Sequence, residues 1–289
     1  MQQVTFFPRS SSRPAPPQNG RASPRPARGR SPSARRAAGA TVDDQRFTAR
    51  TAVVTGAGSG IGRATALRLA REGATVVVVD SSARRLEDLV ADEPLLPLFP
   101  VVADLTEEGA AGRVLAAADG RLDVLVNNAG IMDRFESVAE VDDETWDRVF
   151  AVNVVAVMRL TRAAIPLLRA SGRGAIVNVA SEASLRGSAA GAAYTASKHA
   201  VVGLTRNTAL MHAADGIRTN AVAPGATATG IEAPMDSDLF PGRMGAFLQN
   251  VPYTATAEQV AAVVVFLASD DASNVNGVVL PSDGGWSAV

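Results

Sequence analysis

The chain has 289 residues, which is enough for one large α/β domain or two small ones. It contains no cysteine, so disulfides and thiolate metal sites are excluded. Eight of the 28 basic residues lie in residues 1–42, which hold no acidic residue, so the rest carries 20 basic against 29 acidic residues. This acidic body lacks the basic face of a nucleic-acid-binding domain, and no apolar run approaches the roughly 20 residues of a membrane span. We expect neither nucleic acid nor a membrane as a partner, and we expect a cytoplasmic location.

Residues 1–42 differ in composition from the rest of the chain. They contain seven of the 16 prolines together with many serine, arginine and glycine residues, a composition that cannot bury a core and predicts a disordered extension. A passive extension, an organellar transit peptide and a nucleic-acid-binding tail are all compatible with an arginine-rich, acid-free segment. The folded domain is expected to occupy residues 43–289.

The first predicted strand, residues 51–55, runs directly into the glycine-rich turn Gly56-Ala-Gly-Ser-Gly-Ile-Gly62, and a helix is predicted over 63–72. Glycines at such a turn let the backbone approach a pyrophosphate, and the free amides at the helix start favour its negative charge. Strand, turn and helix in this order predict a dinucleotide site. Its candidate contacts are Gly56, Ser59, Gly60 and Ile61.

The second predicted strand, residues 74–79, ends at Asp80. A carboxylate at this distance from the glycine turn can accept both ribose hydroxyls of an adenosine and would repel a 2′-phosphate, which favours NAD over NADP. Arg84 and Arg85 follow closely and could bind such a phosphate, although their spacing is typical of the exposed face of the next helix. An NADPH-dependent enzyme therefore stays as the alternative.

A third strand is predicted over 97–102, and Pro100 within it cannot donate to a central ladder, which places this strand at a sheet edge. Asp104 and Leu105 follow it and are expected to flank the adenine. After a helix predicted over 106–119, the strand over 122–126 ends in Asn127-Asn-Ala-Gly130. The paired amides can cross-link neighbouring loops, while Ala129 and Gly130 leave room for a ribose. An ordinary polar turn is the alternative.

A long helical pattern over 141–170 carries Asn153 among apolar neighbours, where a buried amide needs a partner. The strand over 175–180 then delivers Ser181, and a helix over 192–214 carries Tyr194 and Lys198 on one face, one turn apart. Such pairs are common on helix surfaces. Here, however, Lys198 is the only lysine among 28 basic residues, which indicates a need for a compact ammonium that arginine cannot meet. A positive charge beside a phenol is expected to lower its pKa and let it exchange a proton with an alcohol or ketone.

The last part of the chain contains a strand predicted over 216–223, a helix over 257–269 and a strand over 277–280. Between the first two, residues 230–252 are rich in apolar side chains broken by proline and glycine. Such a segment suits a mobile lid over an apolar substrate, and a subunit interface is the alternative. His199 and His212 have no partners at metal-ligand spacing, so no metal site is expected.

Four motifs occur together in order: Thr55-Gly-x-x-x-Gly-Ile-Gly62, Asn127-Asn-Ala-Gly130, Tyr194-x-x-x-Lys198 and Pro224-Gly225. With them the chain resembles the short-chain dehydrogenase/reductase family over about residues 44–289. The segments His199-Ala-Val-Val-Gly-Leu-Thr-Arg-Asn207 and Ser269-Asp-Asp-Ala-Ser273 are similar to bacterial NAD-dependent secondary alcohol dehydrogenases of the levodione reductase type.

The resemblance implies a doubly wound Rossmann domain with a parallel seven-stranded sheet in the order 3-2-1-4-5-6-7 and helices on both faces. It implies Tyr194 as acid/base, Lys198 as a ribose ligand, Ser181 as the substrate-orienting hydroxyl and Asn153 as the amide that holds a relay water. Thr227 and Thr229 are the expected contacts of the nicotinamide carboxamide, and Pro224 and Gly225 are further expected cofactor contacts. The implied activity is hydride transfer between NAD and a secondary alcohol or ketone in a homo-oligomer, a dimer or tetramer. The rivals are an NADPH-dependent 3-oxoacyl reductase and a non-catalytic dinucleotide sensor.

Overall fold

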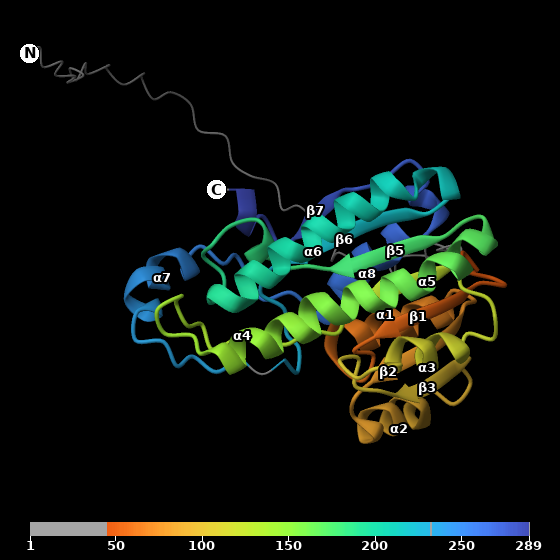
Figure 1. The fold of residues 1–289 in the computed structure, drawn as a ribbon, viewed down its shortest axis with the longest axis horizontal. Coiled ribbons are helices and arrows are strands. Elements are labelled where there is room, and N and C mark those ends of the chain that lie inside the picture. Colours follow the sequence, from red (N-terminus) through yellow and green to blue (C-terminus); the bar gives the residue numbers. More distant parts are fainter. Residues whose placement is uncertain (1–44, 232, 289) are drawn as a thin grey trace, which may run out of the picture. The chain divides into compact units, whose positions relative to one another are not determined.

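The computed structural model describes residues 45–231 and 233–288, so the predicted extension of residues 1–42 lies outside the described residues. Within this part of the chain, seven parallel strands form one sheet in the order β3-β2-β1-β4-β5-β6-β7, as predicted (Figure 1). The strands are β1 Thr51–Thr55, β2 Thr75–Asp80, β3 Leu98–Val102, β4 Val124–Asn127, β5 Ala175–Val179, β6 Arg218–Pro224 and β7 Val279–Ser282.

Eight α-helices accompany the strands in the described part of the chain. They are α1 Gly60–Arg71, α2 Ala83–Asp92, α3 Ala110–Ala116, α4 Asp143–Phe150, α5 Val157–Ser171, α6 Ala192–Met211, α7 Phe240–Leu248 and α8 Ala257–Ala268. Strand and helix alternate along most of the chain, which is the pattern that builds a parallel sheet with helices on both faces. The predicted fold class, a doubly wound Rossmann sheet in a single domain, is confirmed.

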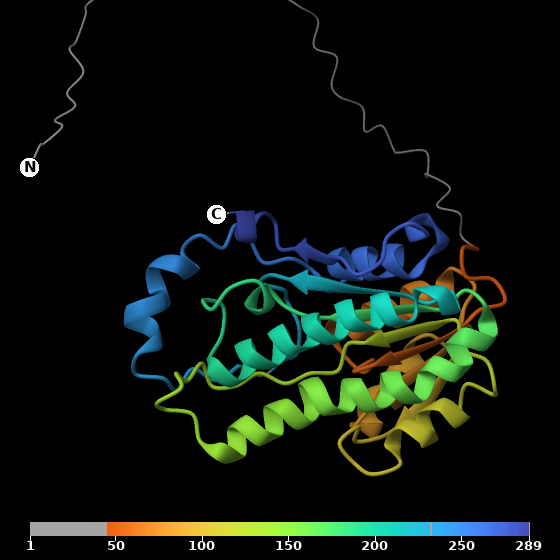
Figure 2. The same cartoon turned by 45° about the horizontal axis from the view of Figure 1, so that its top comes forward.

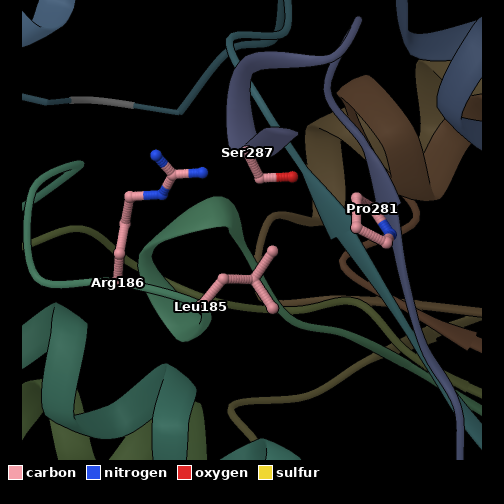
Figure 3. Close-up of a pocket in the computed structure, with 4 residues that line it drawn as sticks. All are labelled: Leu185, Arg186, Pro281 and Ser287. Carbon is pink, nitrogen blue, oxygen red and sulfur yellow. The ribbon is translucent and has the colours of Figure 1, made fainter. Parts of the chain in front are cut away.

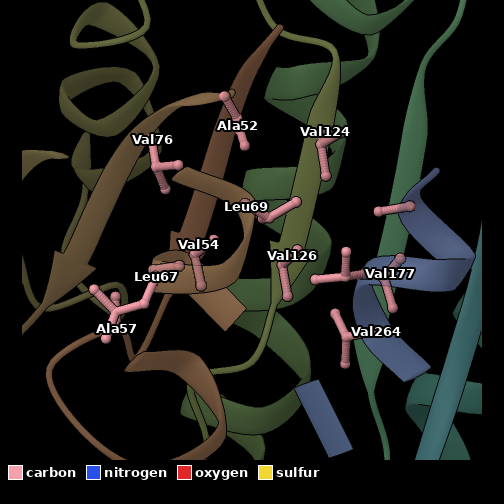
Figure 4. Close-up of a cluster of buried hydrophobic side chains, with 14 of the residues drawn as sticks. Ala52, Val54, Ala57, Leu67, Leu69, Val76, Val124, Val126, Val177 and Val264 are labelled. Carbon is pink, nitrogen blue, oxygen red and sulfur yellow. The ribbon is translucent and has the colours of Figure 1, made fainter. Parts of the chain in front are cut away.

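The central strands are buried on both faces because they are nearly continuous runs of valine, alanine and leucine. One face packs against α1, α2 and α8, and Figure 4 shows part of this cluster, with Val54, Val126 and Val177 of the sheet near Leu69 of α1 and Val264 of α8. The other face packs against α3 and α5, and α6 covers β5 and β6 on that side. Helices thus cover both faces of the sheet, and the packed strands fix where the loops at its carboxyl end begin.

The edge position predicted for the proline-containing strand is confirmed. Pro100 lies in β3, which pairs only with β2 among the described strands. Predicted element boundaries differ from the observed ones by a few residues, most at the helix expected over 106–119, of which only Ala110–Ala116 is α-helical.

The helix predicted over 141–170 is present as one run over Asp143–Ser171, but its geometry changes around Asn153. Residues Ala151–Ala156 form a π-helical turn between α4 and α5. Such turns are rare and are frequently found at functional sites. The sequence did not predict this turn, because a π-turn leaves the apolar pattern of a helix almost unchanged.

The continuous helical run Asp143–Ser171 has 29 residues and, by length and composition, is apolar enough to cross a membrane. A buried core helix passes the same test, so this criterion alone does not indicate a membrane span. The run is also a core helix, since Leu160, Ala164 and Leu168 are buried against the sheet. Its arginines Arg159 and Arg162 are exposed on the opposite side.

The order of the strands reverses between β1 and β4, because β1 pairs with β2 on one side and with β4 on the other. In an open parallel sheet a ligand binds outside the carboxyl ends of the strands at such a point. Figure 2 shows the strand arrows directed towards the end of the domain where α7 lies. The glycine turn, Asn127–Gly130, Ser181 and Pro224-Gly225 all follow strands at this end.

Candidate active site

The glycine turn between β1 and α1 is built so that only glycine fits at several positions. Gly56 and Gly60 have φ angles of +64° and +50°, in the left-handed region that favours glycine. A Cβ added to Gly62 would lie 2.1 Å from the carbonyl oxygen of Gly56. The first turn of α1 has no acidic residue, and the hydroxyl of Ser59 does not cap it. The positive end of the helix is therefore available to an anion, as the pyrophosphate of a dinucleotide requires.

Two polar side chains join the turn to the neighbouring strand. The hydroxyl of Thr55 accepts hydrogen bonds from the amides of Asn128 and Ala129, both at 3.0 Å. The side-chain amide of Asn128 donates to the carbonyl of Thr55 at 2.9 Å and to that of Gly56 at 3.2 Å. The predicted cross-linking of loops by the paired amides is confirmed for Asn128. Neither Thr55 nor Asn128 was predicted as a cofactor contact, although the pair of asparagines in the motif indicated Asn128.

Asp80 stands beside the glycine turn at the end of β2. One carboxylate oxygen accepts from the amide of Gly58 and the other from that of Ser82, both at 3.0 Å. Each oxygen keeps a free lone pair, so the pair of ribose hydroxyls expected here fits the carboxylate. Arg84 is exposed and lies 3.9 Å from Asp88 on α2, while the Cβ of Arg85 would lie 2.7 Å from a Cβ on Gly58.

The residues expected at the adenine follow β3. The carboxylate of Asp104 accepts from the amide and the hydroxyl of Thr106, at 2.9 and 2.7 Å, and these hydrogen bonds lower its pKa. Leu105 is partly buried and packs against the core on the α3 side of the sheet. Their contact with an adenine stays a prediction.

The loop after β6 closes on the glycine turn from the other side. A Cβ at Gly60 would lie 3.0 Å from the Cβ of Thr229, which brings this loop next to the dinucleotide turn. The hydroxyl of Thr227 donates to the carbonyl of Gly225 at 3.0 Å. Gly225 approaches the C-terminal segment so closely that an added Cβ would lie 2.8 Å from the Cβ of Asp283. The structure thus brings the predicted pyrophosphate and nicotinamide contacts together, with Pro224 buried at the strand end.

Ser181 and Tyr194 meet at the carboxyl end of β5. The hydroxyl of Ser181 lies near enough to the phenol of Tyr194 to lower its pKa, and it accepts from the amide of Ala183 at 3.1 Å. Tyr194 lies in the first turn of α6 and only 8% of it is exposed. The role expected for Ser181, holding the substrate oxygen beside the phenol, stays a prediction.

Lys198 lies one turn further along α6 and is almost completely buried. Its ammonium donates to the carbonyl of Val179 at 2.8 Å and lies 5.4 Å from the centre of the Tyr194 ring. Burial lowers the pKa of Lys198 to about 8. An arginine could not occupy this position without further acceptors, because its guanidinium carries five N–H donors.

The expectation that Lys198 lowers the pKa of Tyr194 is wrong for the polypeptide alone. Burial raises the pKa of the phenol to about 12, the nearby Ser181 hydroxyl lowers it, and the charge of Asp133 adds to the rise. The desolvation of the phenolate destabilises it by more than its contacts within the chain stabilise it. The side chains of the site therefore hold the phenol in its protonated form.

Asn153 lies in the π-helical turn with 1% of its surface exposed. Its side-chain nitrogen donates to the carbonyl of Ile131 at 2.9 Å and to the hydroxyl of Ser197 at 3.1 Å, and its oxygen accepts from the amide of Ile131 at 2.9 Å. A Cβ at Gly130 would lie 3.2 Å from this oxygen and 3.4 Å from the Lys198 nitrogen. The amide keeps one acceptor lone pair, so the implied role in holding a water stays a prediction.

Asn127 was predicted to contact the cofactor, but its side chain is part of a buried polar chain. Its nitrogen donates to Asn178 at 2.8 Å and to Thr161 at 3.1 Å. Asn178 in turn donates to the hydroxyl of Thr205 on α6 at 2.8 Å. These bonds connect β4 and β5 with α5 and α6, so any cofactor contact of Asn127 would come from its main chain.

Glu182 follows Ser181 directly and is 1% exposed. Burial raises its pKa, and its carboxylate forms an ion pair with Arg186 at 2.5 Å. Its charge is therefore engaged in an ion pair within the protein. A cavity of about 590 Å³ lies beside this pair, lined by Leu185, Arg186, Pro281 and Ser287 (Figure 3). Neither Tyr194 nor Lys198 lines it.

The segment predicted as a lid contains α7 and is anchored at one end. Phe240 packs against Phe135 with ring centres 4.7 Å apart, and the hydroxyl of Ser237 donates to Glu140 at 2.9 Å. Ile231 and Met235 remain about half exposed. In the described residues, no group of three or more histidine and acidic side chains could hold a metal ion.

Comparison with known proteins places this site in a family. Residues 50–239 match the short chain dehydrogenase family. The chain belongs to this family. Levodione reductase of Leifsonia aquatica is 40% identical over 256 residues, covering 84% of this chain and 96% of the relative. The 3beta-hydroxysteroid dehydrogenase 2 of Eggerthella lenta is 40% identical over 250 residues, covering 82% and 95%.

The crystal structure of a levodione reductase superimposes with a TM-score of 0.75 at 37% identity, covering 84% of this chain and 99% of that chain. The protein is thus an oxidoreductase of the short-chain dehydrogenase family, whose members use a nicotinamide dinucleotide and act on small molecules. The glycine turn, the uncapped start of α1 and the carboxylate of Asp80 fit such a dinucleotide.

Proposed function

We propose that this protein is an NAD-dependent dehydrogenase that interconverts a secondary alcohol and its ketone. One observation carries the proposal: the phenol of Tyr194 is buried, and the only lysine of the chain lies with its ammonium 5.4 Å from the centre of the phenol ring. This group lies at the end of the sheet where the glycine turn and Thr229 meet. A proton donor and a dinucleotide cradle at one place are what hydride transfer to a carbonyl requires.

In the proposed reaction, the substrate oxygen lies between the hydroxyls of Ser181 and Tyr194. During oxidation the phenolate of Tyr194 accepts the alcohol proton, and during reduction the phenol returns it. Lys198 places a buried positive charge near the ring of Tyr194 and would bind the ribose. Asn153 binds the amide and the carbonyl of Ile131 and so fixes the main chain that follows Gly130. When bound, the oxidised cofactor supplies a hydride acceptor and a positive charge that favours the phenolate.

The experiment that tests the proposal is a screen of secondary alcohols, sugars and hydroxysteroids with NAD and NADP side by side. The names of two relatives, a levodione reductase and a 3beta-hydroxysteroid dehydrogenase, support the inclusion of cyclic ketones and hydroxysteroids. We expect turnover with NAD. Tight NADH binding without turnover of any compound would instead indicate a dinucleotide sensor.

Asp80 supports NAD as the preferred cofactor, and its replacement provides a direct test. Asp80→Asn removes the negative charge that opposes a 2′-phosphate, while Arg85 remains beside Gly58. We expect the ratio of kcat/KM for NADP to that for NAD to rise roughly 10- to 100-fold, the effect of about 1.4 to 2.7 kcal/mol of charge interaction. The matched control is Asp88→Asn on the exposed face of α2, which should leave the ratio unchanged. A wild-type preference for NADPH would contradict the proposal.

We also propose that the protein is a homo-oligomer, a dimer or tetramer. Support comes from large apolar side chains at the end of α6, where Leu210 is 77% and Met211 is 64% exposed. Light scattering coupled to gel filtration should give a mass that is a multiple of the 29.8 kDa chain. The mass of a single chain would refute the proposal.

A further inference from the structure

The first turn of α6, which carries Tyr194, is held by a segment far away in the sequence. The first amides of a helix have no partners within it and must be satisfied from outside. Here the amide of Tyr194 donates to Asp133 at 2.8 Å, that of Gly191 donates to the same carboxylate at 3.1 Å, and that of Ala192 donates to the carbonyl of Glu136 at 2.8 Å. Residues 133–136, between β4 and α4, therefore cap the helix.

Asp133 is the central residue of this cap. Only 1% of it is exposed, and it also accepts from the amide of Phe135 at 3.0 Å. It takes part in none of the ion pairs found among the described residues. Three N–H donors and the positive end of the α6 dipole are its stabilising partners.

The fit between the cap and the helix is tight. A Cβ added to Gly191 would lie 2.6 Å from a carboxylate oxygen of Asp133. Phe135 adopts a φ of +61°, an uncommon conformation for an aromatic residue that costs about 1 kcal/mol or more. Its amide is held by Asp133 and its ring by Phe240. A segment with a strained residue, Phe135, is thus held against the point where α6 begins.

We propose that Asp133 is a positioning residue for Tyr194: it fixes the first turn of α6 and places a buried negative charge behind the phenol. This inference rests on the proposed function, in which Tyr194 exchanges the proton. The charge of Asp133 also contributes to the raised pKa of Tyr194, after burial, the larger cause. Its carboxylate thus keeps the phenol protonated until a bound cofactor and substrate favour the phenolate.

Few other charges can act on the phenol. On α6 itself, Lys198 lies beside the Tyr194 ring, whereas His199 and Arg206 are exposed. Glu182, which follows Ser181, is paired with Arg186. Asn153 in the π-helical turn is neutral. The charged side chains of α4, which also packs against α6, are exposed: Asp143, Glu144, Asp147 and Arg148.

Tyr194 can be observed directly because the chain has only one other tyrosine, Tyr253. In a Tyr253→Phe background, the phenolate absorbance reports Tyr194 alone and needs neither cofactor nor substrate. Asp133→Asn removes a negative charge near the phenol and should therefore lower the pKa of Tyr194. At any pH well below the wild-type pKa, we expect the phenolate fraction to increase up to about tenfold. The matched control is Asp142→Asn, which alters the carboxylate cap of α4 and should leave the phenolate unchanged.

The same variant should move the acid limb of the pH profile of alcohol oxidation to lower pH, because the Tyr194 phenolate then forms at lower pH. Circular dichroism and NADH binding check that the fold is kept, and Asp133→Ser carries the same comparison if the asparagine variant does not fold. An unchanged phenolate fraction in a folded variant would overturn the inference even if alcohols are oxidised. An increased fraction in an enzyme that oxidises no alcohol would support the role of the charge and refute the proposed function alone.

Discussion

Replacing Tyr194 with phenylalanine is expected to lower kcat by roughly 10²- to 10⁴-fold, the contribution of a positioned general acid or base. The substitution removes only the hydroxyl. The ring remains in the buried cluster formed with Ala183 and Ala190, so the fold and the dinucleotide cradle should be preserved. The measurements are steady-state oxidation and reduction, with NADH binding followed by fluorescence. We expect binding within a few-fold of the wild-type value.

The chain offers a matched control for this variant. Tyr253 is the other tyrosine, half exposed and packed against Gly284 in the C-terminal segment. Tyr253→Phe makes the same chemical change outside the site and should keep kcat nearly unchanged. If Tyr194→Phe oxidised alcohols as fast as the Tyr253 variant, the proton would have to leave by another group, and the assignment of Tyr194 would be lost.

The sequence was sufficient for the parts of the fold that depend on local signals. Continuous apolar strands, the glycine turn and Pro100 each restrict the backbone within a few residues, and they predicted the strand sequence and the edge position of β3. Asp80 could be placed by its distance from the glycine turn. The strand order itself came from the family resemblance.

Interactions between distant segments could not be predicted in the same way. Asp133 and Tyr194 are 61 positions apart, and nothing in the local pattern around Asp133 indicates that it caps α6. Asn127 and Asn128 are neighbours in the sequence, but the side chain of one joins a buried polar chain and that of the other braces the glycine turn. Their difference follows from the alternation of side chains along a strand, which sends adjacent residues to opposite faces.

The acidity of the phenol was predicted in the wrong direction for a physical reason. The spacing of Tyr194 and Lys198 along α6 showed that a charge is near, but it gave no measure of burial. Desolvation outweighs the attraction of that charge when both groups are removed from water. The structure shows both groups almost completely buried, at 8% and 4% exposure. A sequence motif therefore identifies the participants of a proton transfer more reliably than their pKa values.

Replacing Lys198 with methionine is expected to reduce kcat/KM at least about a hundredfold, because the buried positive charge and the proposed ribose ligand are both lost. Lys198→Arg should also be inactive, since a planar guanidinium with five donors would find the carbonyl of Val179 as the acceptor that now binds the ammonium. Retention of activity by the arginine variant would contradict the view that the site needs a compact ammonium.

The methionine variant also makes a prediction about stability and pH. Burial holds the pKa of Lys198 at about 8, below its ordinary value of 10.5, so the unfolded chain binds this proton more tightly than the folded one. The free energy of unfolding of the wild type should therefore rise with pH between about 8 and 10.5 through this group. Methionine lacks the titration. Its free energy of unfolding relative to the wild type should be most favourable below pH 8.

That relative advantage should shrink by on the order of 2 to 3 kcal/mol as the pH rises through this window. Urea unfolding of both proteins at several pH values measures the difference, and the subtraction cancels the titrating groups that do not interact with Lys198. A difference that does not change with pH would mean that the lysine titrates alike in the folded and unfolded chains. The Lys198 ammonium would then not experience the desolvation that burial imposes. Since the same burial is the main cause of the raised pKa of Tyr194, that pKa would also need another explanation.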